Sequence, residues 1–254
     1  MTKFDRLSTL MDRFSLTVAP APLQAATLVV VSARHNTPQQ VLFRTSGAGF
    51  NIPAESCEFC AVVDWGGAAN PLLATLPDIV KVDLSKDAET RGLVDLIETE
   101  FSQQRCGAGS VVNRLGEVLI VRMLRAQIEA GTTRAGLLAG LSDPRVSRAI
   151  VAMHDHPGRE WRNADLAHIA GLSLSRFAEM FGTLVGEPPA AYLRKWRLIL
   201  ARQDVVKGDR VDAIARRYGY TSSEGFARAF KKHFGENPIT LRPISRPNPR
   251  SLPK

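Results

Sequence analysis

The C-terminal part of the chain contains the same short pattern twice. The first copy starts at Ala167-His168-Ile169-Ala170-Gly171 and continues to Phe177, Phe181, Gly186 and Pro189. The second starts at Ala215-Arg216-Arg217-Tyr218-Gly219 and continues to Phe226, Phe230, Gly235 and Pro238. In each copy a short helix should end at a glycine, and a second helix should start after a turn that contains Ser or Thr. The pattern predicts two helix-turn-helix units.

The sequence around the repeat predicts where these helices begin and end. We expect one helix to start at Pro144, after Ser142 or Asp143 as its cap, and the next to be capped by Asn163. Ser173 should cap a helix over 174–185, and a second helix of this kind should cover 222–233. A long helix from Pro188 or Pro189 to about Val206 should connect the two units.

Charge is distributed unevenly along the chain. Residues 1–141 contain 13 Lys and Arg against 14 Asp and Glu, a net charge of −1, whereas residues 142–254 contain 20 against 11, a net charge of +9. A basic excess that is confined to the part with the repeat is typical of a protein that binds a polyanion such as DNA.

The N-terminal half shows a different pattern. An amphipathic helix is expected over Phe4–Phe14, followed by four short β-rich runs: Thr27–Ser32, Gln40–Phe43, Ala61–Asp64 and Ile79–Val82. Helices should return at about Ala88, and a longer one should cover Ser110–Ala130, where Val118–Leu124 is apolar on nearly every side. A helix of this kind must be covered from two directions, either by a second subunit or by other elements of the same chain. The chain is therefore expected to be an α+β protein whose helical hairpin forms a dimer.

Length and composition support two domains. With 254 residues, the chain can form two hydrophobic cores. We expect a domain with the dimerisation helices over 1–130, a linker over 131–142, a basic domain with the two helix-turn-helix units over 143–243 and a basic, Pro-rich tail over 244–254. The sequence shows no apolar run of eighteen residues and no secretory signal, which favours the cytoplasm and no membrane contact.

The motifs of the C-terminal part together resemble a known family. The motif residues follow one another in the order Ala167, Gly171, Ser173, Phe177, Phe181, Gly186, Pro189 and Tyr192-Leu193-Arg194, then Ile214-Ala215, Gly219-Tyr220, Phe226, Arg228, Phe230-Lys231, Phe234-Gly235 and Pro238. This order is similar to that of the DNA-binding domain of the AraC/XylS family. The resemblance covers roughly residues 144–243. It implies that two recognition helices enter successive major-groove segments of double-stranded DNA.

The resemblance also implies which side chains reach DNA. The candidates for base contact are Ser175, Arg176, Ala178, Glu179, Ser223, Glu224, Gly225 and Arg228. An arginine such as Arg228 can donate two hydrogen bonds to guanine, or it can simply contact phosphate. Glu224 can accept from cytosine, or it can close a capping box with Thr221. The candidates for phosphate contact are Arg194, Lys195, Arg197, Lys231 and Lys232. Glu179 and Gly182 stand where the family often has basic residues.

The N-terminal half resembles the cupin-type sensory domains of one AraC subgroup. The resemblance rests on Asp5-Arg6-Leu7, Phe14-Ser15-Leu16, the stretch from Ala69 to Pro77, and Arg114-Leu115 with Val118-Leu119. It implies a β-barrel, shortened here, that could bind a small-molecule effector. The expected role is thus a homodimeric transcription regulator without enzymatic activity or cofactor, for which RNA polymerase is a further conceivable partner.

Three cysteines leave an alternative open. Cys57, Cys60 and Cys106 could act as a thiol-based redox sensor, although Cys57 and Cys60 can equally be a structural pair. A zinc site would need further ligands, and His35 is the one histidine in this half, so no metal site is expected. For the same reason a cupin-like enzyme fused to a DNA-binding domain is the weaker alternative.

Overall fold

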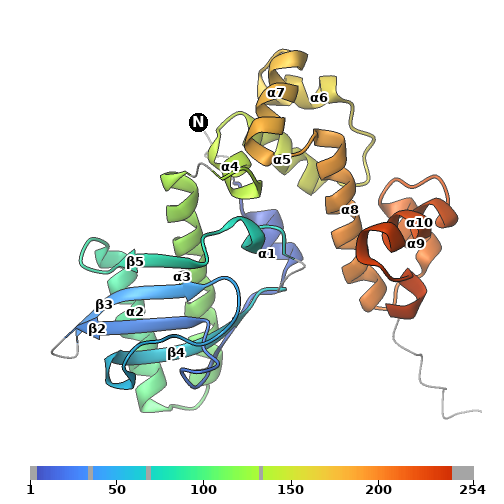
Figure 1. Ribbon diagram of the computed structural model, residues 1–254. Coiled ribbons are helices and arrows are strands. Elements are labelled where there is room, and N and C mark those ends of the chain that lie inside the picture. The colour runs from blue at the N-terminus through green and yellow to red at the C-terminus, as the bar shows by residue number, and fades with distance from the viewer. Residues whose placement is uncertain (1–4, 34–36, 67–69, 132–133, 242–254) are drawn as a thin grey trace, which may run out of the picture.

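The computed structural model describes residues 5–33, 37–66, 70–131 and 134–241. A β-sheet backed by helices forms the N-terminal part, and the C-terminal part is entirely helical (Figure 1). This confirms the expected α+β class. The basic tail over 244–254 lies outside the described residues.

The N-terminal part is built on one antiparallel sheet. Its strands are β1 (Thr17–Pro20), β2 (Leu28–Ala33), β3 (Thr37–Arg44), β4 (Cys57–Asp64) and β5 (Ile79–Asp83). They lie in the order β1-β4-β2-β3-β5, so that β1 and β5 form the two edges of the described sheet. Short 3-10 helices, η1 (Ala54–Ser56) and η3 (Leu73–Thr75), interrupt the loops around β4 and before β5. The shortened barrel is therefore an open sheet.

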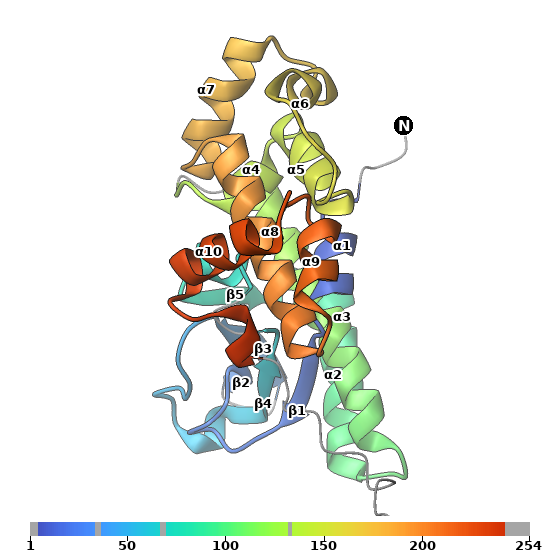
Figure 2. The ribbon, with the colours of Figure 1, turned by 90° about the vertical axis from the view of Figure 1, so that its right-hand side faces the viewer.

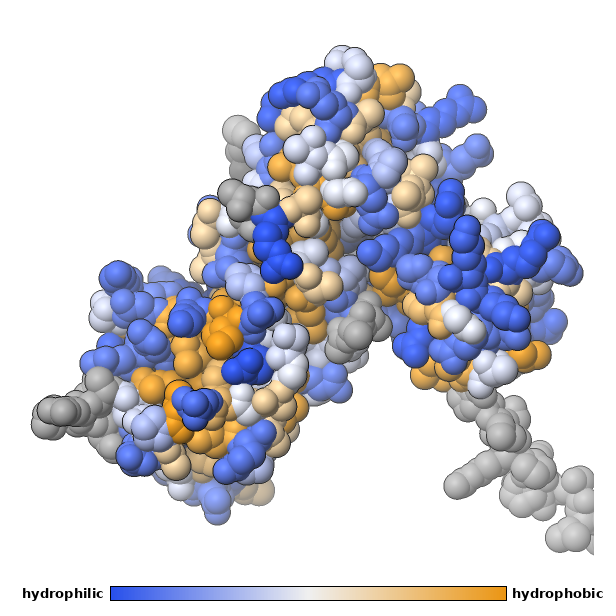
Figure 3. Space-filling model, in the orientation of Figure 1, coloured by the Kyte–Doolittle hydropathy of each residue, from blue (hydrophilic) through white to orange (hydrophobic). Residues whose placement is uncertain are grey.

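Two long helices cover one face of this sheet. They are α2 (Ala88–Gln103) and α3 (Ala108–Ala130), which pack on each other and lie behind the sheet in Figure 1. Val30, Val41 and Phe59 share the covered face and are fully buried. α3 approaches β1 closely, because a Cβ added at Gly116 would lie 2.6 Å from the side chain of Val18. The opposite face of the sheet is turned toward the viewer, where apolar residues also gather (Figure 3).

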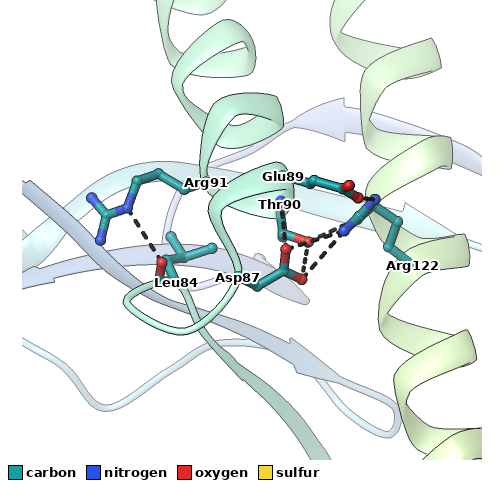
Figure 4. Close-up of polar contacts among 6 residues, drawn as sticks. All are labelled: Leu84, Asp87, Glu89, Thr90, Arg91 and Arg122. Carbon is teal, nitrogen blue, oxygen red and sulfur yellow. Dashed lines mark hydrogen bonds and ion pairs between the residues drawn. The ribbon is translucent and has the colours of Figure 1, made fainter.

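A polar network fixes α2 against α3 (Figure 4). Asp87 caps α2 by accepting from the backbone N–H of Thr90 at 2.9 Å. Arg122, on α3, donates to Thr90 Oγ1, to Glu89 Oε2 and to Asp87 Oδ1 at 2.8, 2.8 and 3.1 Å. The hydrogen bonds from Thr90, with Arg122 nearby, lower the pKa of Asp87. The helical hairpin is therefore held by a fixed hydrogen-bond geometry in addition to apolar packing.

Glu98, on α2, gives the stability of the fold a pH dependence. Its burial, and secondarily the charges of Glu58 and Asp95, raise the pKa of Glu98 to about 7. In the unfolded chain the same carboxyl loses its proton near its ordinary pKa of 4.5. Between these two values a rise in pH therefore favours the unfolded chain, and the free energy of unfolding should fall.

We predict that Glu98→Gln removes this loss. Because the carboxyl is only half-buried, the variant should gain about 1 kcal/mol relative to the original chain between pH 5 and pH 8. Urea unfolding at the two pH values measures the difference, with Glu55→Gln, at an exposed position, as the control. Equal pH dependence in the original chain and in Glu98→Gln would contradict the prediction.

The C-terminal part consists of seven α-helices and one 3-10 helix within the described residues. They are α4 (Leu137–Ser142), α5 (Val146–Asp155), α6 (Asn163–Ala170), α7 (Leu174–Val185), α8 (Pro189–Val206), α9 (Val211–Arg217), α10 (Ser223–Phe234) and η4 (Pro238–Leu241). The long helix α8 runs between the α6–α7 unit and the α9–α10 unit (Figure 1). The N-terminal helix α1 (Ser8–Arg13) packs on α5.

One hydrophobic core runs through both parts of the chain. Phe14, which follows α1, lies 6.0 Å from Trp196 on α8, measured between ring centroids. Arg6 donates to the carbonyl oxygen of Leu141 at 2.8 Å, and Thr9 donates to Asp155. The buried residues of the sheet, of α1 and of the C-terminal helices accordingly form a single cluster.

Several predicted boundaries were wrong. Strand β1 was not predicted, and the first helix begins at Ser8 within the described residues, because Asp5 accepts from the N–H groups of Leu7 and Ser8. The predicted linker over 131–142 contains the buried helix α4. The next helix starts at Val146 instead of Pro144, and its N-cap is Arg145 instead of Ser142 or Asp143, although Asp143 Oδ1 accepts from the N–H of Val146 at 3.0 Å. Arg162, not Asn163, is the N-cap of α6.

Candidate nucleic-acid interface

The first helix-turn-helix unit consists of α6 and α7. α6 ends at Gly171, which has the positive φ of +69° that favours glycine. Ser173 caps α7, as predicted, since its side chain accepts from the N–H of Arg176 at 3.4 Å. Phe177 and Phe181 are fully buried, with ring centroids 5.6 Å apart. These contacts fix α7 on the core and leave its opposite face to solvent.

The second unit repeats this construction with α9 and α10. Gly219 has a φ of +73°, and Ser222 caps α10 by accepting from Gly225 at 3.0 Å. Phe226 and Phe230 are fully buried, again with ring centroids 5.6 Å apart. The structure thus confirms two equivalent helix-turn-helix units.

The cap of α10 decides between the two interpretations of Glu224. A capping box would require Thr221 as the cap and Glu224 three residues later. The cap is Ser222, so Gly225 occupies that third position, and Glu224 is exposed with no hydrogen bond to any described residue. The capping-box interpretation was wrong, and Glu224 remains a candidate for base contact.

The outer face of α7 carries no net charge. Ser175, Arg176, Ala178 and Glu179 are all exposed there, as expected. Arg176 Nη1 lies 2.8 Å from Glu179 Oε2, so the two charges form an ion pair on the surface of the helix. Arg176 can therefore contact a base only after it exchanges this partner.

The outer face of α10 is basic. Glu224, Arg228, Lys231 and Lys232 are exposed, whereas Ser223 and Gly225 are half-buried. A register of 49 residues relates the two helices, so Arg228 occupies the place of Glu179, and Lys231 the place of Gly182. Hydrophilic residues gather over α9 and α10 in Figure 3. α10 is therefore better suited than α7 to approach a polyanion.

α8 contributes fewer free cations than expected. Arg194 and Lys195 are exposed, although Lys195 Nζ lies 3.9 Å from Glu187 Oε1. Arg197 differs from the expectation, because its Nε donates to Pro157 O at 2.6 Å and its Nη2 to Arg159 O at 2.8 Å. Burial lowers the pKa of Arg197. Its guanidinium joins α8 to the loop before α6, and we leave it out of the phosphate-contacting set.

A buried carboxylate that the sequence did not single out orients the second unit. Asp204 Oδ2, near the end of α8, accepts from Arg217 Nη1 at 2.5 Å and from Tyr218 Oη at 2.6 Å. Arg217 Nη1 also lies 2.7 Å from Asp209 Oδ2. Burial and the bond to Asp204 raise the pKa of Tyr218, and the two carboxylates raise the pKa of Arg217. No repeat or spacing marks this cluster, because it forms only when α9 folds back on α8.

A second missed cluster lies where α5 meets α8. His154 Nε2 is 2.6 Å from Tyr192 Oη, and the His154 ring stacks on Trp196 with centroids 4.0 Å apart. Complete burial lowers the pKa of His154 to about 3, so the imidazole is neutral at physiological pH. His154 therefore packs as part of the core.

The cysteines and histidines of the described residues form no metal site. Cys57 and Cys60 are joined by a disulfide on β4, whereas Cys106 is exposed and free. No group of three or more His, Cys, Asp or Glu side chains in the described chain could hold a metal ion. His35 lies outside the described residues. None of the described helices is long and apolar enough to cross a membrane.

Both α7 and α10 are accessible in this arrangement. α7 and α10 lie near opposite ends of α8, and in Figure 2 both are on the left-hand side of the molecule. Arg176 and Arg228 are exposed, so neither is sealed in the core. The geometry is that of two surface helices held apart by a rigid connecting helix.

Comparison with known proteins identifies both parts of the chain. A helix-turn-helix domain model matches residues 166–243, and a cupin model matches residues 11–129. A putative AraC-like transcription regulator of Streptomyces lividans is 36% identical over 175 residues, which is 67% of this chain and 58% of that protein. The regulator AlkR of Acinetobacter baylyi is 30% identical over 178 residues, 68% of this chain and 58% of its own length.

A solved structure is also similar to the C-terminal part. The DNA-binding domain of AdpA, determined in complex with a target DNA, is 26% identical, covers 40% of this chain and 91% of its own, and has a TM-score of 0.37. The matched region spans a little over half the length of the curated relatives. By its helix-turn-helix domain, its cupin domain and these relatives, the chain belongs to the AraC/XylS family.

Proposed function

We propose that the chain is a sequence-specific DNA-binding transcription regulator. The observation that carries the proposal is the pair of equivalent units, each with a serine cap, a buried phenylalanine pair and an exposed polar helix face. The half that contains them has a net charge of +9. In this role α7 and α10 enter neighbouring stretches of the major groove, while Arg194, Lys195, Lys231 and Lys232 contact phosphates.

Selection of bound duplexes from a random pool tests this function. The full chain is expected to enrich one sequence with two subsites at moderate salt. If the selection enriches no sequence but the chain still binds DNA weakly at low salt, the protein binds DNA without reading its sequence.

The two units should contribute unequally. α10 presents Arg228, Lys231 and Lys232, whereas α7 presents the Arg176–Glu179 ion pair. We infer that α10 supplies most of the electrostatic attraction and also the stronger base contact, because Arg228 is exposed whereas Arg176 on α7 is paired with Glu179. The second of the two subsites should therefore show the stronger base preference.

Removing the charge of Glu179 should strengthen binding. Glu179→Gln releases Arg176 and deletes one negative charge next to the phosphates, so we expect an affinity about threefold higher or more. Fluorescence anisotropy with the selected duplex measures it. Glu160→Gln, which removes an exposed charge outside the α7 face, is the matched control. A weaker complex would mean that Glu179 itself contacts a base.

We further propose that the chain is a homodimer through α2 and α3. Four large apolar residues on this hairpin remain exposed: Leu96 (47%), Phe101 (37%), Val111 (40%) and Val118 (50%). The sequence predicted that α3 must be covered from two directions. The described part of the chain covers one side of α3 and leaves apolar side chains exposed on the other. Solvent-exposed apolar side chains along two adjacent helices suit a self-complementary interface.

Val118→Glu should dissociate the dimer. A charge at the middle of this face would have to be buried unpaired, so we expect monomers at concentrations where the original chain is dimeric. Sedimentation velocity measures the state, and Val206→Glu, at an equally exposed position on α8, is the control. A Val118→Glu chain that still dimerises would place the interface elsewhere.

A further inference from the structure

The loop between α5 and α6, residues 156–162, lies against the second helix-turn-helix unit. We call it the α5–α6 loop, and in Figure 1 it runs on the side of α8 that faces α9 and α10. The approach is close, since a Cβ added at Gly158 would overlap the carbonyl oxygen of Arg217 on α9. A Cβ added at Gly219, in the turn of the second unit, would lie 2.9 Å from the carbonyl oxygen of Gly158. The backbone of the loop is therefore in direct contact with the second unit.

The α5–α6 loop is also fixed to the first unit. The Trp161 indole donates to the carbonyl oxygen of His156 at 3.0 Å, and the Arg159 guanidinium lies 4.1 Å from the centroid of the Trp161 ring. These contacts close the loop on itself. Its last residue, Arg162, is the N-cap of α6, and Asp165 of α6 accepts from the N–H of Arg162 at 3.2 Å. A movement of α6 therefore carries the loop with it.

Arg197 on α8 holds the α5–α6 loop at this contact. Its Nε and Nη2 donate to the carbonyl oxygens of Pro157 and Arg159, the two residues that flank Gly158. The same guanidinium reaches the second unit, because a Cβ added at Gly219 would lie 3.3 Å from Arg197 Nη2. A planar guanidinium with donors in fixed directions suits this double contact, which a lysine does not reproduce. One half-buried side chain thus joins α8, the loop and the second unit.

This contact adds a second attachment between the two units. Asp204 already fixes α9 on the end of α8 through Arg217 and Tyr218. The α5–α6 loop links α6 to α9 by a route that does not follow α8. Two attachments at different places resist a rotation of the second unit that either one alone would allow.

We propose that Arg197 is a positioning residue, which sets the orientation of α7 and α10 relative to each other by holding the α5–α6 loop against the turn of the second unit. It does not touch DNA in this role. Because the orientation is set before binding, both helices enter the groove without a further loss of rotational freedom. The gain applies to a site with two subsites and is absent for one subsite alone. The inference rests on the proposed DNA-binding function.

Duplexes with one or two subsites of the selected sequence test this role. Arg197→Lys and Arg197→Gln should each bind the two-subsite duplex about fivefold more weakly or worse, whereas their affinity for one subsite should stay within about twofold of the original. Fluorescence anisotropy measures both. Arg202→Gln is the matched control, because it removes a cation of α8 whose contacts are with Glu236 and Phe234. An equal loss on both duplexes would overturn the proposal, since a phosphate contact or general destabilisation has that effect.

The spacing of the subsites gives a readout that a loss of stability does not change. One inserted base pair turns the second subsite by about 35° around the duplex axis, and we expect the original chain to bind that duplex about tenfold more weakly. In the two Arg197 variants this penalty should fall to about threefold, because the second unit can rotate to follow the subsite. An unchanged penalty in a folded Arg197→Lys chain contradicts the positioning role.

Gly158→Ala tests the same contact with Arg197 unchanged. The added methyl overlaps the carbonyl oxygen of Arg217, so the loop must move away from the second unit. We expect the same weaker two-subsite binding and the same smaller spacing penalty. Gly92→Ala is the matched control, because Gly92 is exposed on α2 with open space around it.

The outcomes separate this inference from the proposed function. If the Arg197 variants do not fold, the spacing penalty of Gly158→Ala decides. If the original chain selects no duplex, the proposed function fails and this inference fails with it. If it selects one and the folded variants keep the original spacing penalty, only the positioning role of Arg197 is refuted.

Discussion

Replacing Arg228 with alanine is expected to lower the affinity for the selected duplex by about 10- to 100-fold. Arg228 is exposed on the outer face of α10 and forms no ion pair with any described residue, so its guanidinium is free to donate two hydrogen bonds to a guanine. The loss should depend on sequence, because the variant no longer distinguishes that base pair. Affinities measured for the selected duplex and its single-base variants give the result.

Two other substitutions separate base contact from charge. Arg228→Lys keeps the cation but not the planar fork, so it should recover binding without recovering the base preference. Lys232→Ala should weaken all duplexes alike and reduce the salt dependence by about one phosphate contact. If Arg228→Ala behaves in the same way as Lys232→Ala, Arg228 contacts phosphate.

Replacing Trp196 with alanine should destabilise the whole chain by about 3–5 kcal/mol. Trp196 is 1% exposed, stacks on His154 and packs against Phe14, so it joins α1, α5 and α8. Its removal leaves a cavity where the two parts of the core meet. Urea unfolding followed by circular dichroism measures the change in free energy.

The control for Trp196 is Val206→Ala. Val206 is on the same helix but is 49% exposed, so its loss should cost less than about 1 kcal/mol. Because one hydrophobic cluster spans both parts, Trp196→Ala should lower the midpoints of the sheet and of the helices together. Independent midpoints would show that the two parts have separate cores.

Local patterns made the C-terminal helices predictable. The serine caps, the glycines with positive φ and the phenylalanine pairs act within a few residues of one another, so the sequence displays them directly. The connecting helix runs over Pro189–Val206, as predicted, because a proline suits the first helical position. The predicted exposure of Arg176 and Arg228 follows from the same periodicity, and their contacts with DNA stay a prediction.

Elements that depend on distant partners were missed. β1 is four residues long, ends in Pro20 and is formed only by pairing with Ala61–Asp64. In α4 the small residues suggested flexibility, yet they serve close packing, because a Cβ at Gly140 would lie 2.5 Å from Ile150. The hydrogen bonds of Arg197 likewise arise from the fold, since its two acceptors precede it by about 40 residues.

The ion pair on α7 can be predicted from spacing alone. Arg176 and Glu179 are three residues apart on one helix, a separation at which opposite charges meet. The sequence alone could thus have indicated that the two candidates neutralise each other.

The connecting helix sets a strict rule for the operators that this protein can occupy. The 18 residues of α8 rise by about 27 Å, and a helix neither stretches nor bends as a flexible tether does. Inserting five base pairs between the subsites turns the second one to the far side of the duplex, and inserting ten restores the side but not the distance. Both insertions should reduce binding to that of a single unit, so that functional sites share one fixed phasing.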